Sequence, residues 1–147
     1  MLGIADAEHA EDRPEAENPI IVSVACAVPN RKPGAPKLWG GLRIRLAPGS
    51  RVHELYAAEA IREEYFCNYE VRPDYRETLE KSDALVTGLG PDDEVRAVEL
   101  PRHRFWIATL YQPQRSSAPG APNPLVRGFV AAAEEFASEK ASRGAWP

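Results

Sequence analysis

Cysteine and histidine are scarce in this sequence: its 147 residues include two cysteines and three histidines. Cys26 and Cys67 are too far apart to form a Cys-x-x-Cys unit, and two cysteines cannot build the disulfide framework of a small secreted domain. The histidines stand on separate segments, so the Cys and His tetrad of a structural zinc site is missing. We therefore expect no metal site and no cofactor.

Long apolar runs and an excess of positive charge are also missing. No apolar stretch approaches the roughly 18 residues that a membrane-spanning helix needs, and the first residues lack the order of a signal peptide. The formal net charge is -4, and the arginines are scattered along the chain. We therefore expect neither a membrane nor a nucleic-acid partner, and the cytoplasm is the default location.

The overall composition is that of an ordinary globular domain, with 44% hydrophobic and 27% charged residues. A chain of this length has room for one hydrophobic core. We expect a single domain over 1–147, in which 1–18 is an acidic loop, 19–137 is the folded core and 138–147 is a tail.

Several segments have the composition of β-strands. The β-branched run 19–28 predicts a strand buried on both faces, and the alternation of apolar and charged residues over 41–46 predicts a half-exposed one. The segment 105–111 is apolar on both faces, which predicts a central strand. The remaining candidates are the aromatic-rich segment 64–71 and the segments 85–88 and 95–100, joined by a hairpin turn at 90–93.

Helical patterns are fewer. Ser50 is a typical N-cap for a short helix that carries Val52 and Leu55 on one face, and a further helical turn starts at Asp74. The clearest helix follows Asn123 as N-cap, with an apolar stripe of Leu125, Val126, Phe129, Val130, Ala133 and Phe136. Strands with short helices and a long final helix predict a layered α/β or α+β arrangement.

The predicted strands are too few for a parallel sheet of normal size. Only one or two other apolar strands could flank the segment 19–28. The sequence therefore predicts an exposed apolar sheet edge or face, which a second copy of the chain or a partner chain could cover by completing the sheet.

Three segments have a recognisable motif order. Residues 98–114 read V-E-L-P-R-H-R-F-W-I-A-T-L-Y-Q-P-Q, and residues 123–130 read N-P-L-V-R-G-F-V. Upstream, residues 40–44 read G-G-L-R-I, and residues 69–71 read Y-E-V. These motifs resemble those of class I glutamine amidotransferase domains of the CTP synthase type, and the resemblance covers about 19–137.

The resemblance implies the fold class: α/β, the C-terminal part of a flavodoxin-like three-layer domain with a mixed sheet and a long C-terminal helix. It also implies a place in pyrimidine nucleotide biosynthesis. Active members use a cysteine on a sharp Gly-x-Cys-x-Gly turn, which exposes the thiolate and aims backbone N–H groups at the oxyanion. A histidine then acts as base, oriented by a carboxylate two residues further on.

The chain departs from this pattern at each of those positions. It contains no Gly-x-Cys-x-Gly turn, and by alignment we expect that turn before Met1. Gln112 and Gln114 stand where the base and its orienting acid belong, and an amide takes up no proton at neutral pH. Asn68 replaces the arginine that binds the glutamine carboxylate. We expect a degenerate domain without autonomous glutaminase activity, either truncated or dependent on a partner.

Two further functions stay open. Cys67 could be a catalytic thiol in a reaction that the sequence does not identify, or an inert buried thiol. Cys26, inside a β-branched run, is expected to be core packing. Alternatively, the chain could be a non-catalytic module that binds a small polar ligand, and the residues assigned to substrate binding in either case are Asn68, Tyr69, Gln112 and Gln114.

Overall fold

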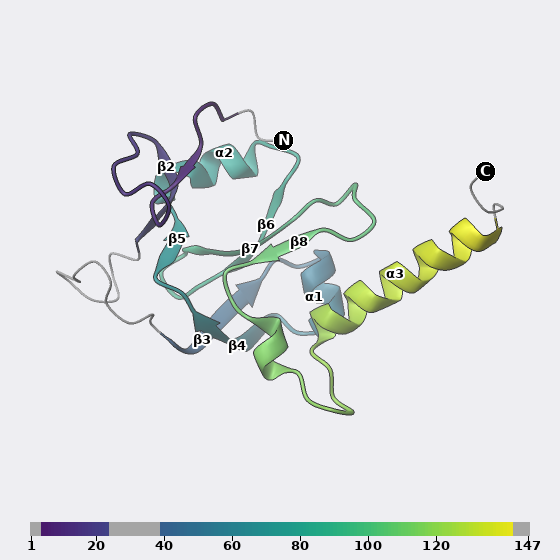
Figure 1. The fold of residues 1–147 in the computed structure, drawn as a ribbon. Coiled ribbons are helices and arrows are strands. Elements are labelled where there is room, and N and C mark those ends of the chain that lie inside the picture. Colours follow the sequence, from purple (N-terminus) through teal and green to yellow (C-terminus); the bar gives the residue numbers. More distant parts are fainter. Residues whose placement is uncertain (1–3, 24–38, 143–147) are drawn as a thin grey trace.

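The computed structural model of the chain describes residues 4–23 and 39–142, which form two sheets and a long final helix (Figure 1). Cys26 and the second half of the predicted strand 19–28 lie outside the described residues. One sheet has the order β1 (Glu8–His9), β2 (Pro19–Ser23), β5 (Tyr69–Val71). The other has the order β4 (Ala60–Phe66), β3 (Trp39–Leu46), β6 (Leu85–Leu89), β7 (Val95–Glu99), β8 (Ile107–Thr109).

The larger sheet is antiparallel at every pairing of neighbouring strands. Its strand β3 confirms the alternation seen in the sequence, because Ile44 and Leu46 are buried whereas Arg43 and Arg45 are exposed. The predicted hairpin is also confirmed, with β6 and β7 joined through the turn at 90–93. Gly88 on β6 has no room for a side chain, since an added Cβ would lie 2.9 Å from the Cβ of Ala97.

The prediction that 105–111 forms a central strand is wrong. Only 107–109 is extended, and β8 stands at the edge of the larger sheet, paired with β7 on one side. Apolar residues on both faces of a strand indicate that other parts of the protein can cover both faces. They do not indicate which strands pair along its edges. Trp106, which precedes β8, is 39% exposed.

The smaller sheet corrects two more expectations. Strand β2 is half-buried rather than buried on both faces, because β1 and β5 pair along its two edges and do not cover its faces. The segment 64–71 is two strands: β4 ends at Phe66 in the larger sheet and β5 begins at Tyr69 in the smaller one. The acidic stretch 1–18, expected to be a loop, contains the two-residue strand β1, which pairs in parallel with β2.

The two predicted short helical segments are confirmed by α1 (Arg51–Tyr56) and by the 3-10 turn η1 (Pro73–Tyr75) with α2 (Arg76–Glu80). A further 3-10 turn, η2 (Pro113–Ser116), was not predicted. The hydroxyl of Ser50 accepts a hydrogen bond from the His53 N–H at 3.1 Å, which confirms the predicted N-cap. Val52 of α1 is fully buried in the core beside Ile44 and Leu46.

The final helix α3 (Pro124–Ser142) leaves the body of the protein after its first turns (Figure 1). It extends five residues past position 137, into the expected tail. At Gly128 it approaches α1 so closely that an added Cβ would lie 2.7 Å from Leu55 Cδ2. Further along, Arg104 holds the helix through a two-bond ion pair with Glu139.

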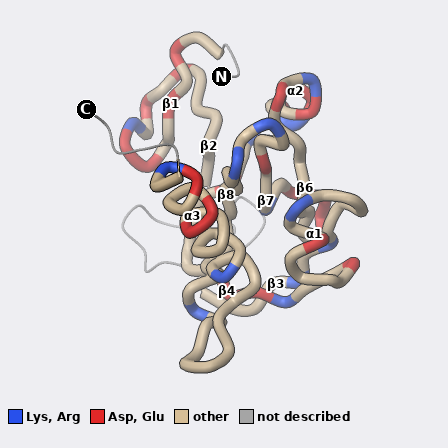
Figure 2. The backbone as a smooth tube through the Cα atoms, turned by 90° about the vertical axis from the view of Figure 1, so that its right-hand side faces the viewer, with Lys and Arg blue, Asp and Glu red and all other residues tan. Residues whose placement is uncertain are grey.

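Charged residues of both signs are interspersed along the described backbone (Figure 2). Among the described residues, no helix is long and apolar enough to cross a membrane.

Candidate functional site

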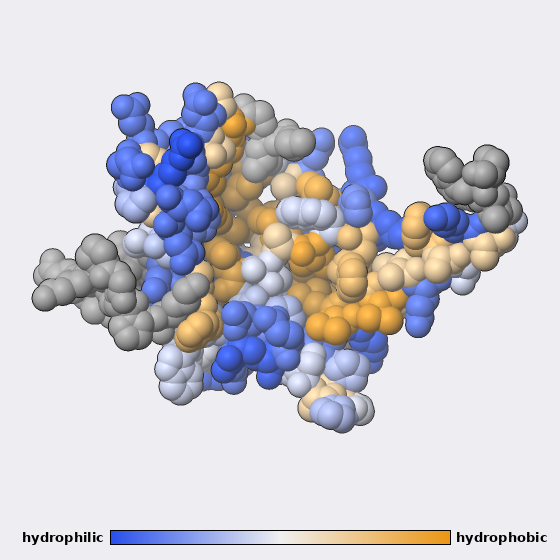
Figure 3. All heavy atoms as spheres, in the orientation of Figure 1, coloured by the Kyte–Doolittle hydropathy of each residue, from blue (hydrophilic) through white to orange (hydrophobic). Residues whose placement is uncertain are grey.

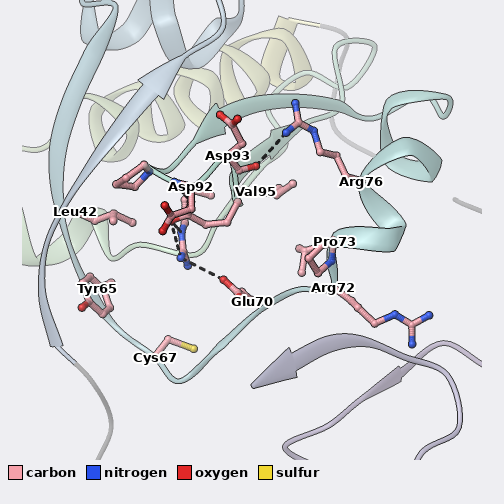
Figure 4. Close-up of a pocket in the computed structure, with 14 residues that line it drawn as sticks. Leu42, Tyr65, Cys67, Glu70, Arg72, Pro73, Arg76, Asp92, Asp93 and Val95 are labelled. Carbon is pink, nitrogen blue, oxygen red and sulfur yellow. Dashed lines mark hydrogen bonds and ion pairs between the residues drawn. The ribbon is translucent and has the colours of Figure 1, made fainter. Parts of the chain in front are cut away.

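A pocket of about 400 Å³ lies between the two sheets (Figure 4). Strands β3 and β4 supply Leu42 and Tyr65 on one side, and β5 with the following turn supplies Glu70 and Pro73 on the other. The β6–β7 turn and the start of β7 complete the lining. The pocket is therefore built where two sheets meet, from segments far apart in the sequence.

Its charged side is a cluster of one arginine and two carboxylates. Arg96 donates to Glu94 at 2.9 Å and to Glu70 at 3.5 Å, and its side chain is only 10% exposed. Burial raises the pKa of the Glu70 carboxyl; Arg96 works against this shift, whereas Glu94 and Asp92 add to it. The sequence analysis did not single out these three residues. Glu70 lies in the Y-E-V motif and Arg96 in a predicted strand, but neither signal indicated a role at a site.

Cys67 lies in the wall of this pocket, between the end of β4 and the start of β5 (Figure 4). Its Sγ accepts a hydrogen bond from the Tyr69 N–H at 3.4 Å, and the residue is half-buried. Asn68 and Tyr69 follow directly but do not line the pocket. The ring of Tyr69 packs instead on His9 of β1, with 5.1 Å between ring centroids.

Gln112 and Gln114 lie elsewhere, where the chain returns from β8 to the edge strand β4. The Gln112 N–H donates to the Glu64 carbonyl at 2.8 Å, and Gln112 precedes η2. Gln112 is half-buried and Gln114 is exposed. Neither lines the pocket that contains Cys67, so the structure divides the predicted site residues between two places.

A buried polar network lies beside Gln112, and the sequence analysis missed it. The carboxylate of Glu63, 4% exposed, accepts hydrogen bonds from Tyr56 at 2.7 Å, Asn123 at 2.7 Å and Ser116 at 2.6 Å. Asn123 also accepts from the Leu125 N–H at 2.9 Å, which confirms its predicted role as N-cap of α3. The network joins β4, α1, η2 and the start of α3. Only burial distinguishes Glu63 from its exposed neighbour Glu64.

Two tyrosines adjoin this network. Burial first, then Tyr111 and the hydrogen bond to Glu63, raise the pKa of Tyr56 far above the ordinary tyrosine value. Burial also raises the pKa of Tyr111, whose hydroxyl has no hydrogen-bond partner within the described part of the chain. Both phenols are therefore neutral at physiological pH and can act as hydrogen-bond donors, not as anions.

The motif at 98–101 has a structural role here. Glu99 is 5% exposed, and its two carboxylate oxygens accept from the backbone N–H groups of Arg51 at 3.1 Å and Val52 at 3.3 Å. These are the first N–H groups of α1, which have no partner inside the helix. Glu99 therefore ties strand β7 to the start of α1, while Ser50 satisfies the next donor.

The described residues contain no group of three or more His, Cys, Asp or Glu side chains that could hold a metal ion. Two of the carboxylates that line the pocket, Glu70 and Glu94, are instead paired with Arg96.

Comparison with known proteins shows which class of domain this fold belongs to. No protein-family profile matches the chain. Among solved structures, the glutaminase domain of Trypanosoma brucei CTPS, determined with bound acivicin, superposes with a TM-score of 0.81 and 27% identity. The match covers 92% of this chain and 53% of that domain. The fold therefore defines the class of the chain as a class I glutamine amidotransferase-like α/β domain, as predicted.

Sequence similarity narrows the class. CTP synthase from Gluconacetobacter diazotrophicus is 37% identical over 142 residues, which is 90% of this chain and 26% of that protein. CTP synthase from Chloroflexus aggregans is 32% identical over 136 residues, 92% of this chain and 25% of that protein. The chain is thus of the CTP synthase glutaminase-domain type and spans about a quarter of the length of these relatives.

Proposed function

We propose that this chain is a degenerate glutaminase-type domain that does not hydrolyse glutamine by itself. Its function, in this proposal, depends on a partner polypeptide. The observation that supports the proposal most strongly is Gln112 and Gln114 at the end of the segment that follows β8. In active glutamine amidotransferase domains, the positions that these two residues resemble hold the catalytic base and the carboxylate that orients it. A part in CTP synthesis, as the names of its relatives suggest, belongs to the same proposal.

The chemistry of the amide side chain explains the expected inactivity. Hydrolysis by a cysteine requires a group that takes the thiol proton and returns it to the leaving ammonia near neutral pH. Gln112 cannot carry that proton, and Gln114 has no charge to stabilise an imidazolium. The 147 residues also contain no Gly-x-Cys-x-Gly turn to hold a nucleophile at an oxyanion site.

Ammonia release from L-glutamine by the purified chain tests the proposal. We expect a rate equal to that of buffer alone, while the Trypanosoma brucei CTPS glutaminase domain serves as the positive control in the same assay. Release of ammonia above the buffer rate, abolished by Cys67→Ser, would overturn the proposal and assign the reaction to the pocket thiol.

A second candidate function rests on the position of Cys67, which lines the same pocket as Glu70 and Arg96. A thiol there could serve a reaction on a small molecule bound in the pocket. Iodoacetamide labelling followed by peptide mass analysis tests this candidate. Faster modification of Cys67 than of Cys26 would favour it, and equally slow modification of both would count against it.

A further inference from the structure

The pocket between the two sheets is lined by more negative than positive charge. Seven charged residues line it: Glu70, Arg72, Arg76, Asp92, Asp93, Glu94 and Arg96. Three of these have ion-pair partners outside the lining, namely Arg72 with Asp74, Arg76 with Glu80, and Asp93 with Arg45. The remaining group is three carboxylates and the single guanidinium of Arg96. One cation therefore faces an excess of negative charge.

Glu70 is the less well paired of the two half-buried carboxylates in this group. Its contact with Arg96 is 3.5 Å long, whereas Glu94 accepts from the same guanidinium at 2.9 and 3.1 Å. The Glu70 side chain is nevertheless only 12% exposed. A buried carboxylate costs free energy unless a cation or donor faces it. Burial, followed by repulsion from Glu94 and Asp92, raises the pKa of Glu70, and a second cation beside it would offset both effects.

The rest of the lining suits a short hydrocarbon chain. Leu42, Val71 and Val95 give aliphatic surface, and the ring of Tyr65 gives an aromatic one. Figure 4 shows Leu42 and Tyr65 on one side of the ion-paired cluster and Pro73 on the other. An aromatic ring attracts a cation as well as an alkyl chain. A volume of about 400 Å³ is at the small end of the range for ligand pockets.

We propose that this pocket binds a small organic cation, an ammonium or guanidinium group on a short apolar body, with the Glu70 carboxylate as its counter-ion. The cationic head donates to Glu70, which Arg96 leaves incompletely paired, and the apolar body packs against Leu42 and Val95. The inference holds whether or not the chain hydrolyses glutamine. It also gives the class of molecule that would lie beside Cys67.

Exposed apolar surface elsewhere is a competing place for an alkyl chain. Figure 3 shows hydrophobic residues gathered along α3, where Phe129, Val130 and Phe136 are 59%, 48% and 56% exposed. We call these three residues the α3 face. Binding to this face depends on apolar contact and does not need the Glu70 carboxylate. A neutral probe of the same length therefore separates the α3 face from the pocket.

Three probes of equal chain length test the inference: n-butylammonium, 1-butanol and butyrate. Each is titrated into the full chain at constant ionic strength, and amide chemical shifts from nuclear magnetic resonance locate the binding. We expect n-butylammonium to shift the amides of Glu70, Val71 and Arg96. It should bind at least tenfold more tightly than either of the other two probes.

Matched substitutions identify the counter-ion. Glu70→Gln keeps the shape of the side chain and removes its charge, so it should weaken the binding of n-butylammonium at least tenfold. Glu77→Gln removes an equal charge from α2, where the side chain is 75% exposed, and should leave the binding unchanged. Phe129→Ala, on the α3 face, should also leave it unchanged. Circular dichroism checks that each variant folds.

Four results would overturn the inference: no shift of the pocket amides with any probe, equal affinity for all three probes, tighter binding of butyrate, and binding of n-butylammonium that Glu70→Gln leaves intact. Tighter binding of butyrate would assign the pocket to an anion. The comparison of probes uses the wild-type chain, so it decides the question even if Glu70→Gln does not fold. Failure here is distinguishable from failure of the proposed function, because the ammonia assay measures glutamine hydrolysis and not the binding of these probes.

Discussion

The two parts of helix α3 differ in how completely the chain covers them. At its start, Asn123 and Leu125 are 3% and 6% exposed, and every polar atom of the Asn123 amide is hydrogen-bonded. One turn later, Phe129 is 59% exposed. The start of the helix is thus buried and held by hydrogen bonds, whereas apolar side chains further along it are exposed.

This difference shows which part of the fold the chain covers with its own residues. Around Glu63, buried donors and acceptors find partners within the chain, and such a satisfied network specifies one arrangement of β4, α1 and α3. Further along α3 the apolar side chains of Phe129 and Val130 are 59% and 48% exposed. The first region is closed by the chain's own residues, whereas Phe129 and Val130 stay exposed, and the following predictions test this contrast.

The largest effect is expected for Glu63→Ala, which removes the acceptor shared by Tyr56, Asn123 and Ser116. Buried groups left without a partner cost about 1–3 kcal/mol each, so the free energy of unfolding should fall by about 3 kcal/mol or more in urea titrations. The adjacent Glu64→Ala is the control, because its exposed ion pair with Arg115 contributes at most about 1 kcal/mol. Equal losses for the two variants would contradict the closed network.

The next effect compares two apolar residues on α3. Leu125→Ala creates a cavity in the core and should lower the free energy of unfolding by about 2–4 kcal/mol. Phe129→Ala removes a largely exposed ring and should change it by less than about 1 kcal/mol in the chain alone. Chemical denaturation of both variants measures the difference. A larger loss for Phe129→Ala would mean that the chain covers its own α3 face.

A smaller effect is expected at the start of α1. Glu99→Gln replaces one carboxylate oxygen by an NH2 group, which cannot accept, so one of the N–H groups of Arg51 and Val52 loses its acceptor. The free energy of unfolding should fall by about 1–2 kcal/mol, as for loss of a helix cap. Glu54→Gln, on the exposed side of the same helix, should change it by less than about 0.5 kcal/mol. A stability unchanged by Glu99→Gln would show that water replaces the cap.

The smallest effect concerns alkaline pH. The folded-state pKa of Tyr56 and Tyr111 is raised, first by burial, so the fold favours the neutral phenols. Their contribution to stability is complete below the unfolded tyrosine pKa of about 10 and is lost as the pH rises above it. Urea midpoints at pH 8 and pH 11 should therefore differ less for Tyr56→Phe than for wild type. Identical differences would argue against a buried Tyr56 hydroxyl.

Much of the fold was predictable where the structure of a segment depends on residues within that segment. The charged and apolar alternation of β3, the Ser50 cap of α1, the Asn123 cap of α3 and the hairpin at 90–93 are local patterns, and the structure confirms them. Local patterns succeed because side-chain periodicity and capping depend on residues within a few positions of each other.

The failures share a different cause. The apolar segment containing β8 was predicted to be central, and it is an edge strand. The segment 64–71 was predicted as one strand, and it divides between two sheets at Cys67 and Asn68. In both cases the pattern predicts an extended, apolar segment. It does not predict which strands pair with that segment, because these strands lie far away along the chain.

The predicted site was identified only in part. Motif order led to Cys67 and to Gln112, but it gave no role to Glu70, Glu94 and Arg96, which form an ion-paired cluster in the pocket around Cys67. Glu63 and Glu64 show the same difficulty, since two adjacent glutamates have opposite burial and different tasks. Whether Cys67, Asn68, Tyr69, Gln112 and Gln114 act in catalysis or binding stays a prediction.

The sequence by itself determined the class of the domain, the caps of its helices and the amides at 112 and 114, because each depends on residue identity at particular positions. Only the tertiary structure decided which glutamate is buried, which strand stands at the edge and where apolar side chains stay uncovered. Burial depends on what the rest of the chain brings against a residue, and the described residues leave Phe129 and Val130 59% and 48% exposed.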